Sequence, residues 1–239
     1  MQGSSIPGID MASAAMKMND DGSFNLLVGA TDLGTGSDTV LAQIAAETLG
    51  TNVDKIIVYS SDTDFTPFDS GAYASSTTYL SGSAVRECAR KCREQILDVA
   101  CQMFGIEQSR RKELRIENGW VKLSGTKKKK SFAQIALYSL YQKEQFQIGA
   151  IASRISHQSP PPFAAHFAEV EVDSWTGLVR VVKYVAAVDC GTAVNPPLAE
   201  GQTEGAVLTG ISCALTEEFI FDNKGRVLNP NFAYYKNCL

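Results

Sequence analysis

The pattern of apolar and polar positions predicts a chain that contains both helices and strands. Apolar residues at helical spacing predict helices over residues 37–49, 83–104 and 132–141. Short or alternating apolar runs predict strands over residues 13–18, 24–29, 56–59, 114–116, 120–123, 164–172, 178–188 and 218–221. The two types are segregated rather than strictly alternating, so the predicted fold class is α+β, with mixed strands and helices.

Turn and capping residues support these boundaries. The tetrad at 19–22 joins the first two strands, Asn118-Gly119 suits a hairpin, and Gly105 suits the left-handed position after a helix. Asn195, followed by two prolines, predicts the start of a further helix. Residues 62–81 are rich in small and hydroxyl side chains, and a loop of that length in a compact domain predicts function.

The run Ser-His-Gln-Ser-Pro-Pro-Pro at residues 156–162 interrupts all regular structure. It predicts a boundary between two parts, 1–155 and 156–239, with one continuous domain as the alternative. Polar residues of the second part are predicted to be structural, with His166 in the core of its strand and Glu217 and Glu218 at a strand edge.

Composition and charge narrow the classes of function. Hydrophobic residues make up 44% of the chain and charged residues 20%, which is typical of a globular protein with a buried core. The formal net charge of −4 argues against a nucleic-acid partner, and the four lysines at 127–130 are predicted to lie in a solvated loop. No apolar run approaches the roughly 18 residues of a membrane span, so no membrane partner is predicted.

Cysteine usage points to a reducing compartment. The six cysteines form no Cys-x-x-Cys pair and follow no recognisable signal peptide, so reduced thiols in a cytoplasmic protein are expected. Cys88 and Cys92 stand at i,i+4 on the long predicted helix and could share a metal ion, but only two histidines are present to complete a ligand set. We therefore predict that no side chain of this chain ligates a metal.

The sequence Asp-Leu-Gly-Thr-Gly-Ser-Asp-Thr at residues 32–39 is the first candidate site. It follows an apolar strand and opens directly into a helix, whose first N–H groups lack partners and carry the positive end of the helix dipole. Such an arrangement binds anions. It is not a P-loop, because no Gly-Lys-Ser/Thr follows, and a glycine turn with a purely structural role is the alternative.

Three segments, taken in order, resemble a known enzyme family. They are the turn at 34–39, the loop of small residues at 71–82, and a third block over 189–206. The third block reads Asp-Cys-Gly-Thr-Ala-Val-Asn-Pro and then Glu-Gly-Gln-Thr-Glu-Gly-Ala, and Ala-Glu-Val-Glu-Val-Asp precedes it at 168–173. In order and spacing these segments resemble the molybdenum-binding subunit of the xanthine dehydrogenase and aldehyde oxidase family.

The resemblance implies a fold and a cofactor. The fold would be the second molybdopterin-binding region of these molybdenum hydroxylases, and the cofactor is molybdopterin, or its cytosine dinucleotide form, with molybdenum. These enzymes hydroxylate aldehydes or N-heterocycles with oxygen derived from water. Iron–sulfur clusters and FAD would lie on partner chains, so the resemblance implies an oligomer with other hydroxylase subunits.

The resemblance also implies that ten residues bind the cofactor: Gly34, Thr35, Gly36, Ser37, Thr39, Ala74, Ser75, Ser76, Thr77 and Gln202. The backbone of Ala74 would lie beside the oxo and sulfido ligands of the metal, and Gln202 would hydrogen-bond the cofactor near molybdenum. Thr35 stands where the family commonly has glutamine, and Ser5 where it has a small residue at the substrate pocket. Without the resemblance, the hydroxyls of the 71–82 loop are equally typical of turns and caps.

The resemblance assigns no catalytic residue to this chain. The family's base is a glutamate in a Gly-x-Gly-Glu context, some tens of residues after an Asn-Phe-Ala-x-Tyr-Lys phrase that stands here at 231–236. No Gly-x-Gly-Glu occurs in the sequence, so the base glutamate is expected beyond the chain end. We therefore expect a truncated or split piece of a hydroxylase, inactive by itself. The alternatives are a non-catalytic remnant or interaction module that binds no cofactor, and a plain phosphate-binding module at 34–39.

Overall fold

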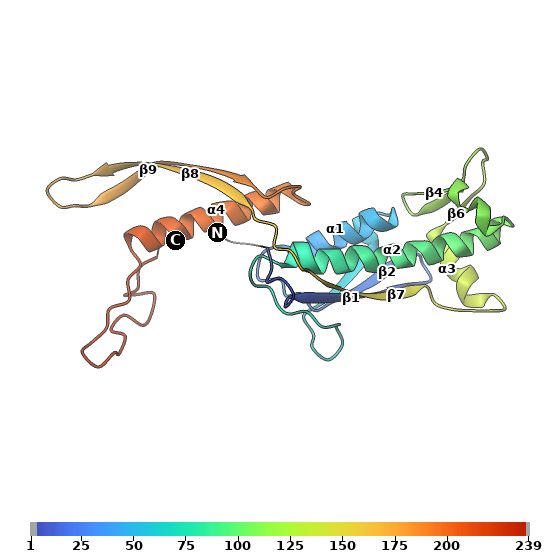
Figure 1. The fold of residues 1–239 in the computed structure, drawn as a ribbon, viewed down its shortest axis with the longest axis horizontal. Coiled ribbons are helices and arrows are strands. Elements are labelled where there is room, and N and C mark those ends of the chain that lie inside the picture. Colours follow the sequence, from blue (N-terminus) through green and yellow to red (C-terminus); the bar gives the residue numbers. More distant parts are fainter. Residues whose placement is uncertain (1–3, 238–239) are drawn as a thin grey trace. The chain divides into compact units, whose positions relative to one another are not determined.

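The computed structural model describes residues 4–237 of the chain. It separates into two compact units, Met1–Pro161 and Pro162–Leu239, and each unit is described by itself. Figure 1 draws the first unit in blue, green and yellow and the second in orange and red. Both units contain helices and strands, which confirms the predicted α+β class.

A mixed four-stranded sheet is the framework of the first unit. Its strands, in the order β3-β2-β1-β7, are β1 (Met11–Met18), β2 (Phe24–Val28), β3 (Ile56–Ser60) and β7 (Gly149–Ile155). β1 pairs antiparallel with both β2 and β7, whereas β2 and β3 are parallel. The carboxyl ends of β2 and β3 therefore lie at the same edge of the sheet.

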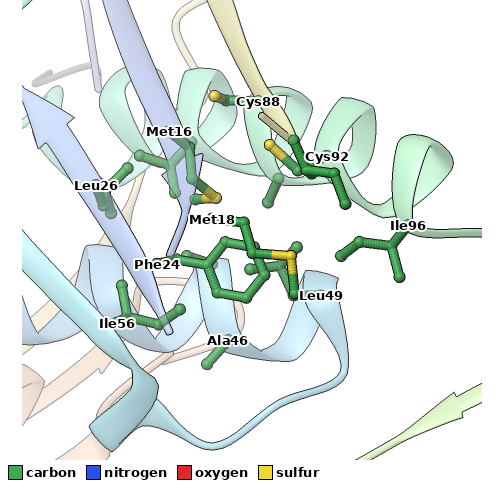
Figure 2. Packing of buried hydrophobic residues seen from close by; sticks show 14 of the residues in the cluster. Met16, Met18, Phe24, Leu26, Ala46, Leu49, Ile56, Cys88, Cys92 and Ile96 are labelled. Carbon is green, nitrogen blue, oxygen red and sulfur yellow. The ribbon is translucent and has the colours of Figure 1, made fainter. Parts of the chain in front are cut away.

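Two helices, α1 (Ser37–Leu49) and α2 (Thr77–Phe104), cover one face of this sheet. Alternate residues of β1 and β2 point toward them, and Figure 2 shows the side chains of Met18 and Phe24 meeting those of the helices. The Phe24 ring also meets the ring of Phe132 edge-on, with centroids 5.8 Å apart, at the start of α3 (Phe132–Tyr141). Burial of these apolar surfaces holds the unit together.

Short elements complete the first unit: η1 (Val53–Lys55), η2 (Gln108–Glu113), β4 (Leu114–Glu117), β5 (Trp120–Leu123) and β6 (Lys129–Ser131). The last three form a separate antiparallel sheet in the order β4-β5-β6. The predicted hairpin is confirmed, because Asn118 (φ 48°) and Gly119 (φ 73°) both hold the left-handed conformation that a two-residue turn requires.

The second unit is a long hairpin followed by a helix. Strands β8 (Phe163–Val172) and β9 (Val179–Asp189) are antiparallel, and α4 (Pro196–Leu215) follows them. The predicted cap is confirmed, because the Asn195 side chain accepts a hydrogen bond from the backbone N–H of Leu198 at 3.2 Å. Within residues 4–237, no helix is both long and apolar enough to cross a membrane.

Several predicted elements were wrong in extent or type. The long helix α2 begins at Thr77, six residues before the predicted start, so the preceding loop covers only 61–76. Strand β7 was not predicted at all, and residues 218–221 form no strand, with Phe221 making only an isolated bridge to Val227. The first turns of α2 carry few long apolar residues, and β7 lacks clear alternation, so neither has a strong periodic signal.

Some predicted environments were also wrong. His166 is exposed on β8, with its ring 5.8 Å from that of Tyr184, rather than in a core. Strand β3 is an edge strand with a half-exposed outer face. Lys129 and Lys130 lie in β6 rather than in a loop, and Glu217 follows α4, where it accepts a hydrogen bond from the Tyr235 hydroxyl at 2.7 Å.

The thiols fall into two groups. Cys88, Cys92 and Cys101 are buried in α2, whereas Cys190 and Cys213 are exposed, and all five are free. The sixth cysteine, Cys238, lies outside the described residues. Burial raises the pKa of the Cys101 thiol and thereby disfavours its thiolate form.

Candidate functional site

The two main helices of the first unit begin at the same end. Gly82 of α2 faces α1 so closely that a Cβ added there would lie 2.8 Å from Cδ1 of Ile44. Farther along both helices, Nη1 of Arg93 donates to the carbonyl of Thr48 at 2.9 Å. Because these contacts advance in the same direction along α1 and α2, the helices are parallel and their N-termini lie side by side.

This end is also where β2 and β3 finish. The N–H of Ser61, just after β3, donates to the carbonyl of Val28 at 3.2 Å. The hydroxyl of Ser60 donates to Oδ2 of Asp38, in the first turn of α1, at 3.0 Å. The carboxyl ends of two parallel strands and two helix N-termini therefore meet at one edge, an arrangement that commonly binds ligands in sheets with parallel strands.

The turn before α1 needs its glycines. Gly34 (φ 93°) and Gly36 (φ 74°) have backbone conformations that other residues disfavour, and a Cβ added at Gly34 would meet nothing within 4 Å. The Asp32 carboxylate accepts hydrogen bonds from the N–H groups of Gly34 (2.9 Å), Gly36 (3.1 Å) and Asp38 (3.4 Å). These three donors were predicted to be available to an external anion, but Asp32 already occupies them.

Asp32 is ionised at neutral pH. Its burial would raise the pKa of the carboxyl, but the hydrogen bonds from the following backbone N–H groups outweigh that effect and hold the pKa below its ordinary value. The turn thus carries a fixed negative charge. Hydroxyl groups that could hold a ligand at this edge are present on the half-buried Thr35 and the exposed Thr39.

One buried hydroxyl in this turn has no internal partner. Ser37 Oγ, at the first position of α1, is buried, and no described residue hydrogen-bonds to it; the same is true of Asp38 Oδ1. Buried polar atoms in folded proteins nearly always have a partner. A bound polar group at the start of α1 would complete these interactions, so the residues fit a ligand at this position.

The loop before α2 holds a strained backbone. Ala74 (φ 49°) and Ser75 (φ 52°) are two adjacent non-glycine residues in the left-handed region, which is rare and costs roughly 1–2 kcal/mol for each residue. Ser76 anchors the loop, since its side chain donates to the carbonyl of Tyr73 at 2.8 Å. The Tyr73 hydroxyl in turn donates to the fully buried Asp10. Strain that the surrounding contacts maintain in this way is typical of a ligand-binding loop.

The remaining predicted site residues are placed as follows. Thr77 is the first residue of α2 and is half-buried, so it lies at the same end of the unit as the glycine turn. Ser5 is only 5% exposed, and its hydroxyl donates to the carbonyl of Gln158 at 3.1 Å. Gln202 is exposed on α4 of the second unit, and a Cβ added at the adjacent Gly201 would meet nothing within 4 Å.

Two aspartates hold the turns before α1 and α2, and neither of them was assigned a role from the sequence. Asp32 binds the N–H of Gly34, and Asp69 binds the N–H of Gly71 at 2.9 Å and the hydroxyl of Ser81 at 2.6 Å. Both stand in an Asp-x-Gly sequence, in which an Asp side chain accepts from the backbone two residues later. That repeated signal could have identified both anchors.

Among the described residues, no three His, Cys, Asp or Glu side chains gather closely enough to hold a metal ion. The site instead combines a glycine turn, a strained loop, several hydroxyls and two helix N-termini at one edge of a sheet. These features are typical of a domain that binds a polar ligand. The chain belongs to the molybdopterin cofactor-binding domain family, whose model matches residues 1–238.

Individual relatives agree with this family. The chain is 40% identical over 238 residues to the probable hypoxanthine oxidase XdhD of Escherichia coli (strain K12), covering 98% of this chain and 24% of that protein. It is 38% identical over 234 residues to the xanthine dehydrogenase molybdenum-binding subunit of Escherichia coli O157:H7, covering 96% of this chain and 31% of that subunit. The chain thus spans about a quarter to a third of these relatives.

Solved structures show the same fold. The chain matches the quinoline 2-oxidoreductase of Pseudomonas putida 86 with a TM-score of 0.87 and 26% identity, covering 98% of this chain and 30% of that one. It matches the Cu,Mo-CO dehydrogenase with a TM-score of 0.86 and 27% identity, covering 95% of this chain and 29% of that one. The fold is therefore that of the molybdopterin-binding domains of molybdenum hydroxylases.

Proposed function

We propose that the edge where α1 and α2 begin binds the molybdenum cofactor of a xanthine dehydrogenase-like hydroxylase. The observation that carries this proposal is the backbone at Ala74 and Ser75, where two adjacent residues keep the left-handed conformation directly before α2. The resemblance gives Ala74 the position beside the metal's ligands. The partnerless hydroxyl of Ser37 supports a polar ligand at the neighbouring helix start.

Each predicted residue then has a positioning role. The backbone of Ala74 would lie beside the metal's ligands, and the hydroxyls that follow it at 75–77 would hydrogen-bond the pterin or its anionic tail. Thr35 supplies a hydroxyl where the family has a glutamine amide. The threonine side chain is shorter, so its polar group reaches less far toward the cofactor. Asp32 fixes the glycine turn by occupying its N–H groups, so the turn offers shape and hydroxyls rather than bare N–H donors. We assign Gln202 a hydrogen bond to the cofactor near molybdenum.

The bound cofactor supplies an electrophilic metal that accepts electrons while water-derived oxygen is added to an aldehyde or N-heterocycle. The chain's own residues hold and orient that group, with Ser5 at the substrate side.

No Gly-x-Gly-Glu base occurs in these 239 residues, so we propose that catalysis requires further segments or subunits. Iron–sulfur and FAD chains would complete the oligomer. We propose a cytoplasmic location, because the five described cysteines are free thiols, as is usual in a reducing compartment. The tail of the cofactor would be a phosphate or a cytosine dinucleotide.

The test measures how firmly molybdenum is retained. The chain is produced together with its hydroxylase partners, and molybdenum and oxidised pterin are quantified during dialysis. Thr39→Val combined with Thr77→Val removes two hydroxyls from the proposed site and keeps their shape. We expect molybdenum to be lost roughly tenfold faster, as for the loss of one to two net hydrogen bonds.

The control is Thr48→Val, which makes the same change in the last turn of α1, where the hydroxyl donates to the carbonyl of Ile44 at 2.7 Å. This variant should retain molybdenum like the unmodified chain. Equal loss from both variants would contradict the assigned site. No molybdenum in any co-produced complex would instead support the alternative of a non-catalytic remnant that binds no cofactor.

A further inference from the structure

Positive charge is concentrated in one lobe of the first unit. Residues 107–131 contain nine lysines and arginines but only three glutamates, although the whole chain has 22 basic and 26 acidic residues. This basic lobe consists of η2 and the sheet β4-β5-β6. A local excess of one sign within an acidic chain favours recognition of a surface of the opposite sign.

The strand register places three cations in one row. Arg115 of β4 lies directly opposite Lys122 of β5, and Lys122 lies directly opposite Lys129 of β6. All three side chains are exposed on the outer face of the sheet. Directly opposed like charges destabilise a sheet. This row of cations (the cation ladder) therefore does not contribute to the stability of the fold.

The surroundings neutralise the cation ladder only in part. Lys122 forms an ion pair with Glu117, and Nζ of Lys129 lies 4.3 Å from the centroid of the Trp120 ring. Within residues 4–237, Arg115 forms no ion pair. Lys127 and Lys128 are exposed at the adjoining β5–β6 turn and add to the same positive field.

We propose that the cation ladder is a docking surface for an acidic helix of a partner protein. Neighbouring strands are about 4.8 Å apart, and residues four apart on a helix face have Cβ atoms about 5–6 Å apart. A helix that crosses the three strands can therefore set one Asp or Glu against each of Arg115, Lys122 and Lys129. The carboxylates would relieve the repulsion within the row.

The structure favours this partner over a nucleic acid. Single-stranded nucleic acid binds through bases stacked on open aromatic faces, but Lys129 occupies a face of Trp120. A long polyanion would also extend beyond the basic lobe onto the rest of the chain, where acidic residues outnumber basic ones. A short acidic helix meets the ladder without extending over the acidic remainder of the chain.

The test uses the full chain and a fluorescein-labelled, alanine-rich helical peptide with Glu at positions i, i+4 and i+7. Binding is followed by fluorescence anisotropy at low salt. The triple variant R115Q/K122Q/K129Q should bind the peptide roughly tenfold more weakly, as for the loss of three exposed ion pairs. Its melting temperature should equal or exceed that of the unmodified chain, because the repulsion within the row is gone.

The matched control K17Q/K55Q/K143Q removes the same charge from exposed lysines elsewhere in the first unit and should bind the peptide as before. Equal weakening by the control would overturn the proposal, because net charge alone would then explain the binding. Tighter binding of labelled oligo(dT) than of the peptide, lost on Trp120→Leu, would overturn it in favour of a nucleic-acid surface.

Discussion

Replacing Asp32 with alanine removes the carboxylate that organises the turn before α1. In the native turn it accepts two hydrogen bonds within 3.1 Å, from Gly34 and Gly36, and a weaker third at 3.4 Å from Asp38. A hydrogen bond to a charged group contributes about 1.5–3 kcal/mol, but water can replace the acceptor at this half-exposed site. We therefore expect Asp32→Ala to lower the free energy of unfolding of the first unit by about 2 kcal/mol at pH 7, and Asp32→Asn by about 1 kcal/mol.

The pH dependence of this effect follows from the lowered pKa of Asp32. A group whose pKa is lower in the folded than in the unfolded state contributes stability above the unfolded pKa, and this contribution is lost as pH falls through the folded pKa. The difference in unfolding free energy between Asp32→Ala and the unmodified chain should thus be complete at neutral pH and should shrink as the pH falls below 3.8, the ordinary pKa of an aspartate.

Urea unfolding followed by Trp120 fluorescence measures this difference, in a Trp175→Phe background that leaves Trp120 as the only tryptophan. The control Asp64→Ala removes the same charge from an exposed side chain in the following loop and should change stability by less than about 0.5 kcal/mol. An equal loss of stability for Asp32→Ala at pH 7 and at about pH 2 would refute the role of the carboxylate charge.

Three further predictions concern the first unit and the thiols. Leu26→Ala, at a fully buried position, should cost about 2–5 kcal/mol in urea unfolding, whereas Leu137→Ala, at a position 45% exposed, should cost below about 1 kcal/mol. Ser131→Ala removes the capping box of α3 and should cost about 1 kcal/mol, with the loss visible as fraying of α3 in amide exchange. With Cys238 replaced by serine, a thiol reagent should modify Cys190 at once, and Cys92, buried in α2, only after denaturant is added; fast reaction of Cys92 in the native chain would contradict the described packing.

The sequence predicts local elements well where the period of apolar residues and the end signals agree. The helices 37–49 and 132–141 have the predicted boundaries, because each has both an apolar stripe and a clear start. The start of α2 was missed because its first turns carry few long apolar residues, and the close contact of Gly82 with Ile44 of α1 leaves no apolar period in the sequence. Strand β7 was missed because it is held to β1 by pairing over seven residues that are distant in the chain.

For the candidate site, too, some features could be predicted from local sequence and others depend on tertiary packing. The residue types at 34–39 and 71–82 indicated two candidate binding segments, since glycines and hydroxyls in these orders are local properties of the sequence. Their occurrence at one edge depends on the parallel packing of α1 and α2, which no local pattern encodes. The strained conformation of Ala74 likewise depends on contacts with distant residues such as Asp10.

By itself, the sequence determined the class of fold and the family and indicated two candidate binding segments, because each of these depends on residue types within a short window. Only the tertiary structure decided that the N–H donors of the glycine turn are already used by Asp32. Only the strand register aligned Arg115, Lys122 and Lys129 in one row, although the lysine run had predicted a solvated loop. The physical reason is that hydrogen-bond partners and strand register are set by the whole packed chain, whereas charge and periodicity can be read one segment at a time.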